Sequence, residues 1–127
     1  MQFKVRDYEL DGQGIVNNAN YLHYFETTRH ELMESCGLRF KDLTEKEIYP
    51  VVRNVNMAYK TSLRGSDTFV SRVGMSKEGI KYFFHQSIYR LPDMVLCCRA
   101  IVEAVCIVGG RAADSKEFDE AFKEYLS

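Results

Sequence analysis

The chain has 127 residues, of which 46% are hydrophobic and 28% are charged. This length and composition are typical of a globular protein with its own core, so we expect residues 1–127 to form a single domain rather than a disordered segment. The formal net charge of −1, with lysines and arginines scattered along the chain, argues against a nucleic-acid-binding protein.

Membrane, secreted and metal-binding classes are also disfavoured. The first residues are already charged and lack the apolar core of a signal peptide, and no apolar run approaches the roughly 20 residues that span a bilayer. We therefore expect a cytoplasmic protein without membrane insertion. None of the four cysteines forms a Cys-x-x-Cys pair, which favours reduced, partly buried thiols over a zinc site.

The first part of the chain predicts a short strand, a glycine turn and one long helix. Apolar residues alternate over residues 3–8, as in a strand. Residues 11–14, Asp-Gly-Gln-Gly, predict an irregular turn, and the asparagines within 17–20 favour a helix N-terminus. Apolar residues at helical spacing over 21–36 predict the helix itself, with Gly37 as its C-cap.

The second part predicts a run of strands and a short final helix. Residues 38–47 are expected to be loop or a short helical turn. After them the apolar period changes to two, which predicts strands over 49–60, 68–75, 80–89 and 94–108, with turns at 76–79 and 91–93. Asp114 and Glu117 resemble a capping box, which predicts a C-terminal helix with an apolar stripe from Phe118 to Tyr125.

These elements predict a two-layer α+β fold. Strands joined by tight turns are antiparallel, and one long apolar helix against such a sheet gives two layers. The helix is apolar over much of its circumference, so we expect the sheet to curl around it. The outer sheet face and the edge strands still need cover, which favours a homodimer or homotetramer.

Asp11 is the best-placed candidate for chemistry, because it precedes the N-terminus of the long helix. Helix N-termini carry unpaired N–H groups and about half a positive charge, so they bind anions or polarise a carbonyl. A carboxylate on the approaching loop would meet a substrate there. Taken alone, Asp-Gly is an ordinary turn dipeptide, and a purely structural turn is the alternative interpretation.

The segment from Val5 to Glu26 resembles the opening of the hotdog-fold acyl-CoA thioesterases of the 4-hydroxybenzoyl-CoA thioesterase type. That family has an acidic residue two positions before the catalytic Asp, then Gly-x-Val, Asn-Tyr and an aromatic helix, which match Glu9, Asp11, Gly14, Val16, Asn20 and Tyr21. Residues 58–67 resemble the family's Tyr-x-x-Pro-apolar-x-x-Gly-Asp corner, with Ser62 in place of Pro and Ser66 in place of Gly. The element order also agrees, so the resemblance covers nearly the whole chain. It implies a hotdog fold: an antiparallel sheet wrapped around one long central helix, with a short C-terminal helix.

The resemblance also implies a reaction, the hydrolysis of an acyl-CoA thioester to a free acid and CoA. Asp11 would attack the carbonyl or activate a water, and a backbone N–H near Asn18 would polarise the carbonyl oxygen. Many relatives carry His or an aromatic residue where this chain has Asn18, which could also be a plain helix cap. No cofactor is implied beyond the CoA of the substrate. An acyl-carrier-protein thioesterase and a non-catalytic acyl-CoA-binding protein are the alternatives.

Other residues are expected around the substrate, at a site on the subunit interface. From the motif these are Gly14, Val16, Asn17 and Tyr21. Met57 and Tyr59 are candidates for the acyl tunnel. Arg111 is the main candidate for the CoA phosphates because related proteins bind CoA near there, with Lys60, Arg64 and Lys77 as weaker candidates. Less favoured as catalytic groups are Glu26, His23, His30 and His85, because Asp11 already supplies the carboxylate and no spacing places them beside it.

Overall fold

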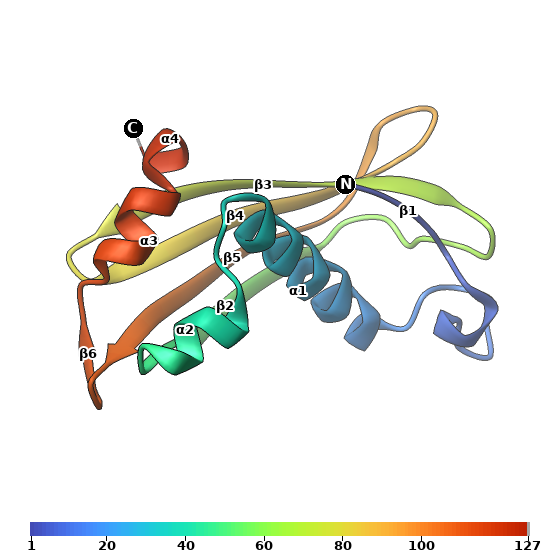
Figure 1. Cartoon of the computed structure of the whole chain (residues 1–127). Coiled ribbons are helices and arrows are strands. Elements are labelled where there is room, and N and C mark those ends of the chain that lie inside the picture. Colours follow the sequence, from blue (N-terminus) through green and yellow to red (C-terminus); the bar gives the residue numbers. More distant parts are fainter. Residues whose placement is uncertain (127) are drawn as a thin grey trace.

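A computed structural model describes residues 1–126 and contains one curved antiparallel sheet with a long helix across one face (Figure 1). The strand order is β1-β3-β4-β5-β2, and β6 pairs with β5. The strands are β1 (Gln2–Lys4), β2 (Ile48–Tyr59), β3 (Thr68–Glu78), β4 (Lys81–Arg90), β5 (Val95–Val108) and β6 (Arg111–Ala113).

The long helix is α1 (Asn18–Ser35), and it forms the second layer. It packs on the sheet through six buried residues, Tyr21, Tyr24, Phe25, Thr28, Leu32 and Met33. The remaining helical segments are η1 (Asp7–Glu9), α2 (Phe40–Glu45), α3 (Lys116–Ala121) and α4 (Lys123–Leu126). In Figure 1, α3 and α4 lie on the same side of the sheet as α1, at the end away from η1. The predicted α+β fold, with a sheet around one long helix, is confirmed.

The N-terminal strand is shorter than the alternation over residues 3–8 predicts. β1 ends at Lys4, and Tyr8 lies in η1 with 84% of its surface exposed. The chain leaves the sheet here because the carboxylate of Glu9 accepts the N–H of Arg6 and closes a single tight turn. Alternation over so few residues does not distinguish a strand from such a turn.

Three details of the C-terminal half also differ from the prediction. β3 continues to Glu78, so the first hairpin turn lies at Gly79 and Ile80 rather than at 76–79. The cap of α3 is Ser115, whose hydroxyl accepts the N–H of Phe118, and not Asp114, which bonds to Lys77 instead. The last helix is also interrupted at Phe122.

β2 is an edge strand of the sheet and carries several exposed apolar side chains. Among residues 1–126, only β5 pairs with it. Tyr49, Val51, Val52, Val55 and Tyr59 are each between 37% and 48% exposed. A long edge strand with exposed apolar residues can pair with another chain.

None of the helices in residues 1–126 has the length and apolar character needed to span a bilayer. The four cysteines are unpaired, and Cys97, Cys98 and Cys106 are buried. Burial raises the pKa of the Cys98 and Cys106 thiols to about 12, so both remain protonated at neutral pH.

Candidate active site

Asp11 is the first residue of a tight turn that leads into α1. Its N–H donates to the carbonyl of Ile15 at 2.8 Å, and one carboxylate oxygen accepts the N–H of Gln13 at 2.8 Å. Gly14 closes the turn with a φ of +76° and donates its N–H to the carbonyl of Asp11. A left-handed residue at this position explains the glycine. The carboxylate is exposed, with its second oxygen free for a ligand or water.

The N-terminus of α1 is capped by Asn17 and not by Asn18. The side-chain oxygen of Asn17 accepts the N–H of Ala19 at 3.0 Å, and its carbonyl accepts the N–H of Asn20. The first N–H groups of a helix have no intrahelical acceptor. The cap therefore satisfies the N–H groups of the two residues that follow Asn18.

The turn and the helix start are held together by Glu9. Its carbonyl accepts both the N–H of Asn17 at 3.0 Å and the side-chain amide of Asn20 at 2.9 Å. Leu10 and Val16 form an isolated β-bridge between these bonds and the turn. The position of Asp11 relative to the helix N-terminus is thus fixed by backbone contacts on both sides of the turn.

A small cavity of about 140 Å³ opens at the start of α1. It is lined by Asn18, Tyr21, Tyr59, Lys60, Thr61 and Ser62, and we call it the Asn18 pocket. The phenol of Tyr59 donates to the carbonyl of Asn18 at 3.4 Å and its ring packs edge-on against that of Tyr21. Burial raises the pKa of both Tyr21 and Tyr59, so these phenols act as hydrogen-bonding groups and not as bases at neutral pH.

Leu63 connects the Asp11 turn to the Asn18 pocket. Its neighbours Thr61 and Ser62 were not predicted from the sequence as site residues. The N–H of Leu63 donates to the phenol of Tyr21 at 3.0 Å, and its carbonyl accepts the N–H of Val16 at 2.8 Å. Thr61 and Ser62 consequently line the pocket. The block 58–67 matches the family corner, but nothing in that match places it beside the helix N-terminus.

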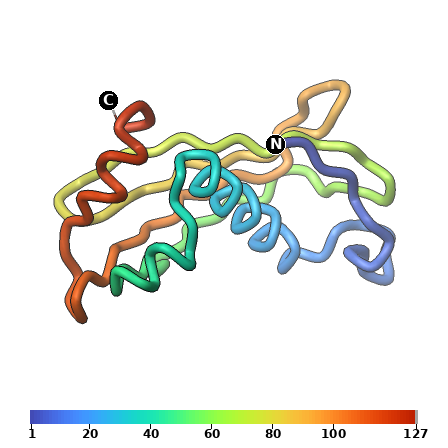
Figure 2. The backbone as a smooth tube through the Cα atoms, in the orientation of Figure 1, coloured from blue at the N-terminus to red at the C-terminus, as the bar shows by residue number. Residues whose placement is uncertain are grey.

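The other predicted site residues fall into two groups. Met57 is half-buried, and its sulfur lies 3.9 Å from the phenol of Tyr59, so it lies next to the Asn18 pocket without lining it. Arg111 lies in β6, at the opposite end of the sheet from the Asp11 turn (Figure 2). It pairs with Val108, which faces Ile48, so about 36 Å of strand separates it from Tyr59. Within one chain, Arg111 does not join the Asn18 pocket.

The less favoured candidates also lie away from Asp11. Glu26 and His30 line a different cavity on α1. The ring of His85 lies 2.8 Å from the hydroxyl of Ser76. His85 also lines a separate cavity whose lining does not include Asp11.

Comparison with known proteins identifies the family and the fold. The family model described as the thioesterase-like superfamily matches residues 5–126. The chain is 34% identical to the chloroplastic acyl-acyl carrier protein thioesterase ATL3 of Arabidopsis thaliana over 94 residues, or 73% of this chain. That alignment spans only 50% of the Arabidopsis protein, so the chain covers about half the length of this relative.

Two further relatives align over most of their length. The long-chain acyl-CoA thioesterase FadM of Escherichia coli is 34% identical over 110 residues, covering 84% of this chain and 80% of FadM. A hypothetical protein from Staphylococcus aureus, solved in complex with CoA, superposes with a TM-score of 0.90 over 98% of this chain and 81% of that one, at 17% identity. The fold is therefore the hotdog fold of these thioesterases, and the chain belongs to the thioesterase-like superfamily.

Proposed function

We propose that this protein hydrolyses acyl-CoA thioesters to a free acid and CoA, and that Asp11 supplies the reacting carboxylate. The observation that carries the proposal is the joining of the Asp11 turn to the helix N-terminus through Glu9 and through the Val16–Leu63 hydrogen bond. Relatives named as acyl-CoA thioesterases, which include the E. coli and Haemophilus influenzae proteins, support the reaction class.

The proposed reaction starts with the thioester carbonyl oxygen at the N–H of Asn18, in the first turn of α1. The helix N-terminus stabilises the negative charge that develops on this oxygen in the tetrahedral intermediate. Asp11 takes a proton from a water molecule as the water oxygen bonds to the carbonyl carbon. Collapse of the intermediate breaks the carbon–sulfur bond and releases the CoA thiolate, which takes up the proton. Because a thiolate is a good leaving group, no strong general acid is needed.

Nucleophilic attack by Asp11 is the other form of the same proposal. The carboxylate would bond to the carbonyl carbon, expel the thiolate and leave a mixed anhydride, which water then hydrolyses. A single turnover in ¹⁸O-labelled water tests for the anhydride. Label in the Asp11 carboxylate requires water attack on the Asp11 carbon of an anhydride, whereas the general-base route, like water attack on the acyl carbon of an anhydride, places the label only in the product acid.

Replacement of Asp11 by Asn tests the carboxylate. Asparagine retains the side-chain oxygen that accepts the Gln13 N–H, so the turn should persist. We expect kcat to fall by about 10²–10⁴-fold, the usual contribution of a general base. Asp7→Asn is the matched control, since Asp7 is an exposed carboxylate of the preceding turn. A loss below about tenfold, with an unchanged circular dichroism spectrum, would contradict the catalytic role. Tight acyl-CoA binding by the wild type without thiol release would favour a non-catalytic binder.

Acyl carrier protein is the alternative carrier, and the Arabidopsis relatives favour it. The two carriers are distinguished by rates on CoA and carrier-protein thioesters of the same acyl chain. A preference for the carrier protein would replace CoA in the proposal and leave the role of Asp11 intact. Assignment to the 4-hydroxybenzoyl-CoA thioesterase type is also a proposal, supported by the loop position of the acidic residue. Aromatic acyl-CoAs therefore belong in the substrate panel.

We further propose a homodimer with its sites at the interface, formed by two β2 edges. In an antiparallel pairing, the Ile48 end of one β2 lies beside the Tyr59 end of the other. This arrangement would bring Arg111 of the second copy, which is adjacent to Ile48 through Val108, toward the Asn18 pocket. Together with Lys60 of the first copy, it would supply cations for the CoA phosphates. The proposed reaction uses no cofactor beyond the CoA of the substrate.

A further inference from the structure

A second cavity lies further along α1, and nothing in the proposed reaction uses it. Its volume is about 250 Å³, and we call it the α1–α3 cavity. The walls come from the second half of α1, from β2, from the sheet and from α2 and α3, and they are mostly apolar, with Met33, Phe40, Val52, Phe84 and Phe118 among them. The polar exceptions are Glu26, Arg29 and His30, all on α1, and the guanidinium of Arg29 donates to Gln86 at 3.0 Å.

The α1–α3 cavity follows the Asn18 pocket along the same side of α1. Glu26 lines the cavity and lies eight positions after Asn18, which is about 12 Å along a helix. Leu22, at the intermediate i+4 position, is 44% exposed. On β2, Met57 and Val55 pair with the buried residues Ala100 and Val102, so they face the helix side of the sheet over the same interval. Leu22, Val55 and Met57 therefore form a path of apolar side chains along the surface between the two cavities.

The length of this path defines a class of acyl group. An extended chain advances about 3.5 Å over three backbone bonds, or roughly 1.2 Å per bond. About ten carbons would therefore reach from a carbonyl at Asn18 to the start of the α1–α3 cavity. A cavity of about 150 Å³ holds benzene, so the larger volume found here accommodates several further carbons.

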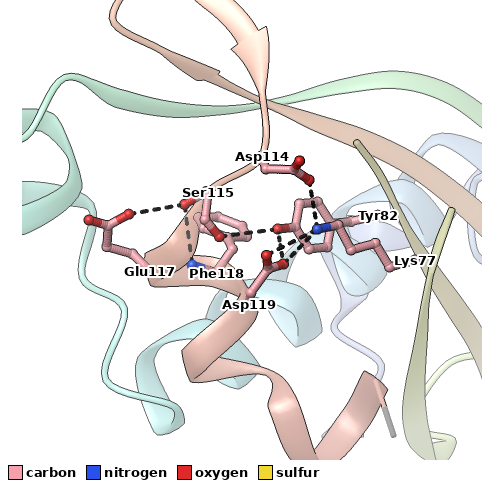
Figure 3. A network of polar contacts seen from close by, with 7 residues as sticks. All are labelled: Lys77, Tyr82, Asp114, Ser115, Glu117, Phe118 and Asp119. Atoms are coloured by element: carbon pink, nitrogen blue, oxygen red, sulfur yellow. Dashed lines mark hydrogen bonds and ion pairs between the residues drawn. The ribbon is translucent and has the colours of Figure 1, made fainter. Parts of the chain in front are cut away.

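The far end of the cavity is closed by Tyr82 and Phe118, whose ring centroids lie 5.5 Å apart. Both rings are buried, with exposures of 1% and 2%. Figure 3 shows the polar network that holds them: the phenol of Tyr82 donates to Asp119, and the hydroxyl of Ser115 accepts the N–H of Phe118 at 3.2 Å.

Lys77 ties this end wall to the sheet. Its ammonium donates to Asp114 at 2.8 Å and to Asp119 at 2.9 Å (Figure 3). α3 is therefore joined to β3 as well as to β4, through side chains on either side of Phe118. A wall held by packing and by this network would resist displacement by a longer chain.

We propose that the α1–α3 cavity binds the distal end of the acyl chain and that Phe118 and Tyr82 set the longest chain the protein accepts. This proposal rests on the proposed function, because the thioester must lie at Asn18 for the chain to point along α1. The preferred substrates are then straight-chain acyl groups of roughly ten carbons or more. Short acyl groups would not reach the cavity.

The test compares two phenylalanines of the C-terminal segment. Phe118 lines the cavity, whereas Phe122 is equally buried at 0% exposure and does not line it. Affinities for a graded series of non-hydrolysable S-alkyl-CoA thioethers are measured by calorimetry for wild type, Phe118→Ala and Phe122→Ala. Hydrolysis rates are measured in parallel on the matching acyl-CoAs. Melting temperatures are measured for both variants to check that they are folded and similarly destabilised.

Removal of the Phe118 ring should move the tightest-binding chain to one longer by roughly two to four carbons, because the vacated space adjoins the cavity. Phe122→Ala should leave the wild-type length preference unchanged. Ala104 also lines the cavity, and Ala104→Leu should shorten the preferred chain. Opposite shifts at Phe118 and Ala104 would support the proposal.

Equal length profiles for the two phenylalanine variants would overturn it, as would a wild-type affinity that does not depend on chain length. The affinities are measured without turnover, so they decide this proposal even if acyl-CoAs are not hydrolysed. Absence of thiol release from every acyl-CoA would instead count against the proposed function.

Discussion

Ser66 adopts a left-handed backbone conformation, with a φ of +66°, in the corner between β2 and β3. This conformation costs an L-residue about 1–2 kcal/mol, and glycine avoids that cost but loses more entropy on folding. We expect Ser66→Gly to raise the free energy of unfolding by about 0.5–1 kcal/mol, measured by urea denaturation. Ser62→Gly is the control from the same corner, since Ser62 has no positive φ, and it should reduce stability. Destabilisation by both changes would show that Ser66 is not strained.

The same corner shows how far single residues could be predicted from the sequence. The family pattern places glycine at position 66, and the positive φ of Ser66 gives the physical reason for it. The pattern could not distinguish Asn17 from Asn18 as the helix cap, because both residue types and positions suit an N-cap. The choice is made by the carbonyl of Glu9, which accepts the N–H of Asn17. Glu9 and Asn17 are separated by the whole turn, so the residues next to Asn17 in the sequence do not indicate this hydrogen bond.

At the scale of elements, the attachment of α3 depends on the charge of Asp119. Burial would raise the pKa of this carboxyl, but the phenol of Tyr82 and the ammonium of Lys77 outweigh it and lower the pKa. A lowered pKa in the folded state stabilises the protein above the ordinary carboxyl value of about 3.9, and this stabilisation is lost as the pH falls through the folded-state value.

Asp119→Asn should therefore reduce the free energy of unfolding by about 1 kcal/mol at pH 7, a modest value because the side chain is partly exposed. The difference from wild type should shrink as the pH is lowered below about 4. Urea denaturation across this range measures both effects. Glu120→Gln is the control, since the Glu120–Lys123 pair is exposed and should contribute little. A constant difference at all pH values would contradict the role assigned to the Asp119 charge.

The elements themselves were largely predictable, and their exceptions have a common cause. The spacing of apolar residues predicted α1 and the four long strands, because their buried faces are long enough to show a regular period. β6 was not predicted, since three residues after two glycines carry no period. The cap of α3 was misplaced by one residue because Lys77, remote in sequence, bonds to Asp114. Contacts between distant segments, rather than local propensity, decided these short elements.

At the scale of the whole molecule, the roles proposed for Asp11 and Arg111 require both residues to reach one substrate from opposite ends of the sheet. The β2 edge is unpaired among residues 1–126 and has exposed apolar residues along its length. Antiparallel pairing of two such edges would bury these side chains. It would also place the Ile48 end of one β2 beside the Tyr59 end of the other. Each site would then combine Asp11 and Lys60 of one copy with Arg111 of the other.

This arrangement predicts complementation between two defective variants. Asp11→Asn homodimers lack the reacting carboxylate, and Arg111→Ala homodimers should have a raised KM for acyl-CoA because a phosphate contact is lost. In a mixed dimer, Asp11 of the Arg111→Ala chain meets Arg111 of the Asp11→Asn chain, which restores one intact site. The other site lacks both groups.

We therefore expect denaturation and refolding of the two variants together to yield activity at low substrate with the wild-type KM. Asn56→Glu in both chains places like charges along the paired edges and should abolish this recovery, whereas Ile101→Glu, at an exposed position on the inner strand β5, should not. If mixing gives only the average of the two parent activities, Arg111 and Asp11 do not act across a β2 interface.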